Sequence, residues 1–265
     1  MSNNSIIAPN LTRRALRAGQ TAIGTMTVEF RQPSVMQLLA NAGFDFTIID
    51  NEHGPFNIES IAGLSQAARQ VGVTPLVRVP DLTYAYIAQS LDSGAQGIML
   101  PRVTSVEQVR EAVRIMKYPP QGIRGCALSR GHTGFKSGSV AEAIAAANQE
   151  TMLIVQVETR QALDELEEIV AVPGVDVILI GPTDLSISLG VPEDQNHPTM
   201  QAAINKVIAA CQQHGVAPAL HINNLDLAVY WAQHGMRMLS FSSETGFLVK
   251  AGREAVSALE QAFGR

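Results

Sequence analysis

The 265-residue chain has little cysteine, little charge and no long apolar run. Its two cysteines, Cys126 and Cys211, stand far apart, a spacing typical of neither a disulfide framework nor a zinc site. The net charge of −5 provides no electrostatic footprint for nucleic acid or an anionic membrane. No apolar stretch approaches the 18 or so residues of a membrane span, and nothing resembles a signal peptide. The composition predicts a globular, cytoplasmic protein with no nucleic-acid or membrane partner.

A short apolar run, an amphipathic segment and a glycine recur in this order eight times. The runs lack alternation, as expected of parallel strands that are covered on both faces. We expect strands at Ala22–Val28, Phe46–Asp50, Pro75–Val79, Gly97–Leu100, Met152–Val157, Val175–Ile180, Ala217–Ile222 and Met236–Phe241. Eight such repeats close most naturally into a (β/α)8 TIM barrel, and the length suits a single domain over residues 1–265. An open doubly wound sheet is the alternative, but no GxGxxG or GxxxxGK[ST] motif follows the first strand.

The segments between the runs carry apolar residues at the helical period. Ser105 and Gln108 match a capping box at the start of one such helix. A long connection between Lys117 and Thr151, rich in glycine and serine, breaks this rhythm. A loop of that length is an active-site cover, an assembly element or a disordered surface excursion, and the sequence does not decide among them.

Chemically capable side chains gather where the expected strands end, which is where barrel enzymes place their catalytic groups. These side chains are Asp50, Glu52, His53, Arg78, Gln156, Glu158, Asp184 and His221. Taken singly, a carboxylate after a strand is often only a helix cap, and a histidine within a strand is often a core residue. It is their convergence on one face of a barrel that indicates a functional site.

The residue types favour metal-assisted enolate chemistry. Glu158 and Asp184 are hard oxygen donors that suit Mg²⁺ or Mn²⁺, and a 2-oxo acid can chelate such an ion while its enolate forms. His53 is the candidate base, Arg78 a partner for the keto oxygen, and the amides of the GPTD turn a site for the substrate carboxylate. No lysine lies on an expected strand, which disfavours a Schiff-base mechanism. No organic cofactor is expected.

Several motifs together extend this interpretation to a family. They are AGFDFTIIDNEHGP, LVRVP, LDSGAQGIMLPRV, YPPQGIRG, VQVETR and PGVDVILIGPTDLS. With these motifs the chain resembles the HpcH/HpaI class II aldolases of the phosphoenolpyruvate/pyruvate barrel superfamily, from about residue 20 to the C-terminus. The resemblance implies a TIM barrel that binds Mg²⁺, Mn²⁺ or Co²⁺. It also implies reversible cleavage of a 4-hydroxy-2-oxo acid to pyruvate (or hydroxypyruvate) and an aldehyde.

The resemblance implies roles for five residues in the chemistry. Glu158 and Asp184 correspond to the metal ligands. His53 corresponds to the catalytic base, and Asp92 to the partner of that histidine. Arg78 corresponds to the residue that polarises the keto group.

Five further residues correspond to the surroundings of the reacting atoms. Asp50 matches a carboxylate near the metal-bound waters, and Gln156, Gly181 and Thr183 fall where the family binds pyruvate and the metal ion. His221 departs from the aliphatic residue common at that strand end, which shapes the aldehyde pocket. We expect this histidine to favour a polar or acidic aldehyde.

The family also implies a homo-hexamer in which a C-terminal helix swaps between subunits. The apolar stripe of that helix, formed by Phe247, Leu248, Ala251, Ala255 and Leu259, either covers a partner or packs on its own barrel. Two other functions stay open at this point. One is an acyl-CoA lyase of the malyl or citramalyl type, and the other is a barrel without catalytic activity.

Overall fold

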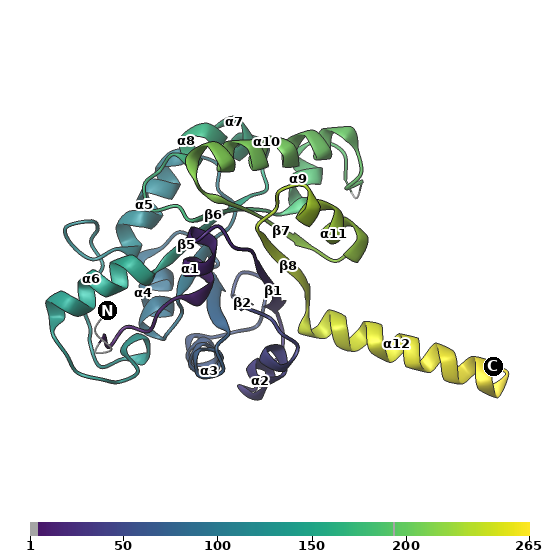
Figure 1. Ribbon diagram of the computed structural model, residues 1–265, viewed down its shortest axis with the longest axis horizontal. Helices are drawn as coiled ribbons and strands as arrows, with labels where there is room; N and C mark the ends of the chain where they lie inside the picture. Colours follow the sequence, from purple (N-terminus) through teal and green to yellow (C-terminus); the bar gives the residue numbers. More distant parts are fainter. Residues whose placement is uncertain (1–4, 193) are drawn as a thin grey trace.

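A closed barrel of eight parallel strands forms the centre of the protein (Figure 1). The computed structural model describes residues 5–192 and 194–265. The strands are β1 (Ala22–Thr27), β2 (Phe46–Asp50), β3 (Thr74–Arg78), β4 (Gly97–Leu100), β5 (Met152–Val157), β6 (Val177–Ile180), β7 (Ala217–Ile222) and β8 (Met238–Ser243). They pair in sequence order, and β8 closes the barrel on β1. The predicted (β/α)8 fold is confirmed, and each strand lies within two residues of its expected bounds.

Helices surround the barrel and connect its strands. They are α1 (Leu11–Arg17), α2 (Ser34–Asn41), α3 (Ile58–Gln70), α4 (Tyr84–Asp92), α5 (Val106–Met116), α6 (Val140–Glu150), α7 (Arg160–Asp164), α8 (Leu166–Val170), α9 (Pro182–Ser188), α10 (Pro198–His214), α11 (Leu225–Gln233) and α12 (Glu244–Phe263). The predicted capping box starts α5, since the Gln108 side chain accepts a hydrogen bond from the Ser105 N–H at 3.2 Å. Among the helices of the described residues, none combines the length and the hydropathy that crossing a bilayer requires.

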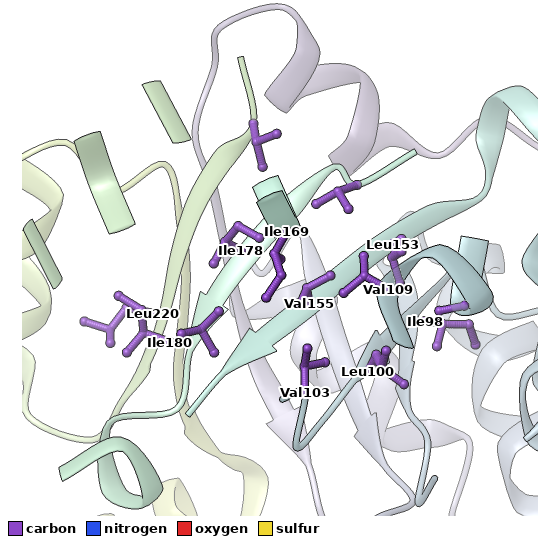
Figure 2. Packing of buried hydrophobic residues seen from close by; sticks show 14 of the residues in the cluster. Ile98, Leu100, Val103, Val109, Leu153, Val155, Ile169, Ile178, Ile180 and Leu220 are labelled. Atoms are coloured by element: carbon purple, nitrogen blue, oxygen red, sulfur yellow. The ribbon is translucent and has the colours of Figure 1, made fainter. Parts of the chain in front are cut away.

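Two hydrophobic cores result from the alternation of side chains along each strand. One set of residues fills the barrel interior and includes Phe46, Ile48 and Leu76. The other set faces outward and packs against the helices. Figure 2 shows part of this outer core, in which Ile98, Leu100, Val103, Val109, Leu153, Val155, Ile169, Ile178, Ile180 and Leu220 pack together. The same period of two decides which side chains point toward the barrel axis.

The segment between Lys117 and Thr151 is ordered by local contacts, so its interpretation as a disordered excursion is wrong. It contains a short 3₁₀ helix, η1 (Gly131–Thr133), and the helix α6, which Ser139 caps. Arg124 and Thr133 within it are 3% and 1% exposed. The sequence conceals this helix because the preceding stretch is rich in turn-forming residues, and α6 has few large apolar residues.

The C-terminal helix α12 leaves the barrel at its first turn and extends away from it (Figure 1). Its start is fixed by Glu244, a buried carboxylate that accepts hydrogen bonds from the N–H groups of Val28, Glu29 and Phe30. Farther along, Leu248 and Leu259 are 62% and 57% exposed. The alternative in which the stripe packs on its own barrel therefore holds only for Phe247, whose ring centroid lies 5.8 Å from that of Phe44.

Candidate active site

The polar residues of the site occupy the last inward-facing positions of the strands. Ile48, Leu76, Ile154 and Ala219 lie in the inner core. Two residues farther along the same strands stand Asp50, Arg78, Gln156 and His221. Because side chains alternate with a period of two, these four also point toward the axis, at the carboxyl ends of the strands. We call this end of the barrel the mouth and the opposite end the base.

Arg78 is fixed at the mouth by two carboxylates. Its Nε and Nη2 donate to the two oxygens of Asp50, at 2.8 and 2.7 Å, and its Nη1 lies 3.1 Å from Glu52 Oε2. Burial alone raises the pKa of Asp50, but hydrogen bonds and charge from Arg78 outweigh it and hold that pKa below its ordinary value. A buried guanidinium in this fork has a defined orientation, as a residue that binds a keto oxygen needs.

Glu158 is buried beside two other carboxylates. It is 4% exposed, and its Oε1 accepts a hydrogen bond of 2.6 Å from the backbone N–H of Arg102. Burial, helped by the negative charges of Glu52 and Asp184, raises the pKa of Glu158 to about 7, although the Arg102 N–H and the charge of Arg78 act in the opposite direction. Negative charge therefore outweighs positive charge around this carboxylate.

A glycine makes room for the polar groups around Glu158. The Gln156 Nε2 donates to Glu158 Oε2. A Cβ atom on Gly181 would lie 2.6 Å from that Nε2 and 2.8 Å from that Oε2, so a larger residue would displace these two polar groups. Gln156 Oε1 is buried without a hydrogen-bond partner among the described residues. A buried acceptor without a partner is costly unless a ligand or a water molecule supplies one.

The donor set at the mouth fits a hard divalent cation. Glu52, Glu158 and Asp184, which we call the acidic cluster, lie along one cavity of about 440 Å³. No three His, Cys, Asp or Glu side chains of the described residues stand as a preformed metal cage. Glu158 and Asp184 can still supply two oxygen ligands, and an ion such as Mg²⁺ commonly keeps water or substrate at its other positions. The excess of negative charge and the unpaired Gln156 Oε1 are consistent with such an ion.

His53 and the start of α9 complete the rim of the mouth. His53 lines the same cavity, its side chain is 69% exposed, and its Nε2 lies 3.8 Å from Glu52 Oε2. Thr183 and Asp184 occupy the first turn of α9, directly after Gly181. The predicted site residues of β2, β3, β5 and β6 therefore meet at one end of the barrel.

Asp92 does not join them within this chain. It is the last residue of α4, and a helix that follows a barrel strand runs back from the mouth to the base. There its Oδ1 accepts a hydrogen bond of 2.5 Å from Arg124 Nη2 and lies 4.0 Å from His132 Nδ1. The expected pairing of Asp92 with His53 is therefore not formed in the single chain, because α4 places the two residues at opposite ends of the barrel.

Two participants at the mouth received no role from the sequence. Glu52 stands two positions after Asp50, and this spacing was a usable signal that both carboxylates face Arg78. Arg102 has a φ of 54°, in the left-handed region that non-glycine residues seldom adopt. The backbone N–H of the same residue donates to Glu158. No sequence pattern predicts this conformation.

Comparison with known proteins shows the family of this chain. The family described as HpcH/HpaI aldolase/citrate lyase matches residues 25–251. The chain belongs to this family. It is 36% identical over 251 residues to a 4-hydroxy-2-oxo-heptane-1,7-dioate aldolase of Escherichia coli, covering 94% of each chain. A protein of the same name from Klebsiella pneumoniae is 38% identical over 251 residues, covering 94% of this chain and 93% of that one.

A solved structure supports the same assignment. The HpcH/HpaI aldolase from Desulfitobacterium hafniense DCB-2 superposes with a TM-score of 0.90 at 33% identity, covering 94% of this chain and 96% of that one. The protein is therefore an aldolase, a carbon–carbon lyase of the class II type. Divalent-metal dependence is typical of this family.

Proposed function

We propose that this aldolase reversibly cleaves a 4-hydroxy-2-oxo acid to pyruvate (or hydroxypyruvate) and an aldehyde through an enolate. The observation that carries the proposal is the juxtaposition of the Arg78 fork with the acidic cluster at one end of the barrel. The names of the relatives from Escherichia coli and Klebsiella pneumoniae place their substrates in the same class of 4-hydroxy-2-oxo acids.

In this proposal Glu158 and Asp184 hold a divalent ion: Mg²⁺, Mn²⁺ or Co²⁺. When bound, such an ion supplies Lewis-acid charge that stabilises the enolate. Asp50 keeps Arg78 oriented, and in this proposal it also hydrogen-bonds to water around the ion. The Arg78 guanidinium binds the keto oxygen and the negative charge that develops on it.

Gln156, Gly181 and Thr183 form the pyruvate end of the site in this proposal. The unpaired Gln156 Oε1 is available to a polar group, and the absence of a side chain on Gly181 leaves the substrate access to Glu158. Backbone N–H groups of the first turn of α9 receive the substrate carboxylate, helped by the partial positive charge of a helix start.

His53 moves the proton. In the cleavage direction its imidazole takes the proton from the 4-hydroxyl group, the C3–C4 bond breaks, and the aldehyde leaves. The same histidine then returns a proton to C3 of the enolate, which gives pyruvate. Its exposed position on the rim of the mouth leaves room for a substrate, and an imidazole is the side chain that enzymes use most often for general acid–base catalysis.

We also infer that the functional assembly is a homo-hexamer in which α12 covers a neighbouring subunit. The exposed apolar residues Leu248, Val256 and Leu259 support an intersubunit role for this helix, since they have no cover on their own barrel. Sedimentation or mass photometry of the full chain measures the assembly directly. A monomer at micromolar concentration would contradict this part of the proposal.

Proton NMR of pyruvate in D2O tests the chemistry without requiring the aldehyde. We expect the pyruvate methyl signal to disappear with the protein and Mg²⁺, and to persist with EDTA. The Glu158→Gln variant, which keeps the shape of the side chain, should behave like the EDTA sample. Persistence of the signal with every divalent ion would contradict the aldolase proposal and favour an acyl-CoA lyase or a barrel without activity.

A further inference from the structure

The side of the mouth formed by β7 and β8 carries a polar pair that the proposed reaction has not used. His221 on β7 and Ser240 on β8 are register partners, and His221 Nδ1 lies 3.0 Å from Ser240 Oγ. Both side chains face the inside of the barrel, because each follows an inner-core residue, Ala219 or Met238, by two positions along its strand. Ser240 is completely buried, whereas His221 is partly exposed. A ligand in the mouth can therefore reach His221 but not Ser240.

The imidazole of His221 is neutral and has one nitrogen to spare. Burial lowers its pKa to about 4, and the positive charge of Arg78 acts in the same direction, while Asp50 opposes it. Nδ1 is occupied by Ser240, and Nε2 has no hydrogen-bond partner among the described residues. The β7–β8 side of the mouth therefore presents one uncharged hydrogen-bonding atom, whereas the β2, β5 and β6 side presents carboxylates.

A hydroxyl group is the substituent that this atom recognises best. If Nδ1 carries the proton, Nε2 is an acceptor, and if Ser240 donates to Nδ1, Nε2–H is a donor. A hydroxyl both donates and accepts, so it pairs with either tautomer. The nearby cation, Arg78, is already paired with both Asp50 and Glu52, so a carboxylate beside His221 would add negative charge where carboxylates already outnumber it. An alkyl group would leave Nε2 unpaired.

We propose that His221, positioned by Ser240, selects acceptor aldehydes that carry a hydroxyl group over acidic and unsubstituted aldehydes. The proposal rests on the aldolase function above and names the class of its second substrate. His221 contacts the substrate in this scheme, and Ser240 acts through His221 by fixing its ring. The earlier expectation of a polar or acidic aldehyde is thereby narrowed to a neutral, hydroxylated one.

The test compares three two-carbon aldehydes as acceptors for pyruvate: glycolaldehyde, acetaldehyde and glyoxylate. For each variant, kcat/KM for glycolaldehyde is divided by kcat/KM for each of the other two. Such a ratio is independent of the fraction of active enzyme, so a variant that folds poorly does not imitate the predicted effect. Pyruvate methyl exchange in D2O is measured on the same samples.

We expect the wild type to prefer glycolaldehyde. His221→Leu should lower the glycolaldehyde-to-acetaldehyde ratio about tenfold, because one hydrogen bond to the substrate is lost. Ser240→Ala should lower it by a smaller factor of about three to five, because the ring remains but is less firmly held. His221→Gln keeps a hydrogen-bonding group and should retain part of the preference. Ser65→Ala removes another buried serine hydroxyl, far from the mouth on α3, and should leave the ratio unchanged.

Two results would overturn the selectivity proposal while pyruvate exchange continues. One is a wild type that prefers glyoxylate or acetaldehyde. The other is an unchanged ratio in both His221→Leu and Ser240→Ala, which would make the pair part of the core packing. A wild type that does not exchange the pyruvate methyl protons at all would instead contradict the aldolase function on which the selectivity depends.

Discussion

The two ends of the barrel both bury charged side chains, but they balance them differently. At the base, Arg13 lies 2.8 Å from Asp176, and both side chains are less than a tenth exposed. Asp92 and Arg124 form a second pair there. At the mouth, Asp50 and Glu52 both pair with Arg78, whereas neither Glu158 nor Asp184 forms an ion pair with a described residue.

This difference separates stability from chemistry within one fold. The two ion pairs at the base are neutralised by the protein itself; they hold α1 to the residue before β6 and α4 to the segment after α5. The buried Lys117 at the same end donates to the carbonyl oxygens of Asn148 and Thr151. Unbalanced carboxylates at the mouth cost folding free energy unless a cation or a proton neutralises them. A site that needs an external cation is one in which a ligand can be bound and released.

The largest effect that we expect is loss of turnover at the mouth. Glu158→Ala or Asp184→Ala removes half of the oxygen donors for the cation and should lower metal-supported turnover about 10³-fold or more. Circular dichroism should show an intact fold. Glu150→Gln at the base, where the carboxylate pairs with Arg14, is the matched control and should keep full turnover. Full activity of either alanine variant would remove the metal assignment.

The base should respond in stability rather than in activity. Asp176→Ala leaves the buried Arg13 without its partner and should lower the free energy of unfolding by about 3 kcal/mol. Chemical denaturation measures this change, and pyruvate exchange per folded molecule should stay at the wild-type level. An Asp176→Ala variant that keeps its stability but loses pyruvate exchange would contradict the assignment of stability to the base and chemistry to the mouth.

The pH dependence of the metal-free protein provides a third comparison. The pKa of Glu158 is about 7 in the folded chain, against 4.5 for an ordinary glutamate. Protonated Glu158 therefore stabilises the folded state below about pH 4.5, and this contribution of about 3 kcal/mol is lost as the pH rises through 7. With EDTA present, the Tm of the wild type should fall relative to that of Glu158→Gln as the pH rises from about 4.5 to 7. A constant difference would show that Glu158 titrates normally.

His53 should give the smallest of these effects. His53→Ala removes the proposed base and should slow pyruvate proton exchange about 10²-fold. Metal affinity, measured by calorimetry with Mn²⁺, should change little, because the imidazole lies outside the proposed ligand pair. Undiminished exchange in this variant would assign the base to another group.

The barrel itself could be predicted from local pattern. Apolar runs such as Met152–Val157 lack alternation because their two faces are covered by the inner and outer cores. The helix α6 escaped prediction because alanine is small and its apolar stripe is weak. The course of α12 escaped as well, since an apolar stripe has the same appearance whether it covers its own barrel or a partner.

Part of the candidate site could also be predicted from the local pattern of the strands. Asp50, Arg78 and Gln156 stand at strand ends, and the period of two places their side chains at the mouth. The position of Asp92 at the base was predictable, because a helix that follows a barrel strand runs back from the mouth. Its expected pairing with His53 came from the resemblance and did not use this rule. The left-handed conformation of Arg102 and the register of His221 with Ser240 depend on distant parts of the chain.

The sequence by itself determined the closed parallel barrel, the end at which its polar residues collect, and the kind of cation that they suit. These features follow from the periods of strand and helix and from the chemistry of single residues. Only the tertiary structure decided which charges are paired. It brought Glu52 to Arg78 and Arg124 to Asp92, and within residues 5–192 and 194–265 it left Glu158 and Asp184 without an ion-pair partner. Distances of a few ångströms across strands and loops decide the balance of charge, and no local pattern along a chain encodes them.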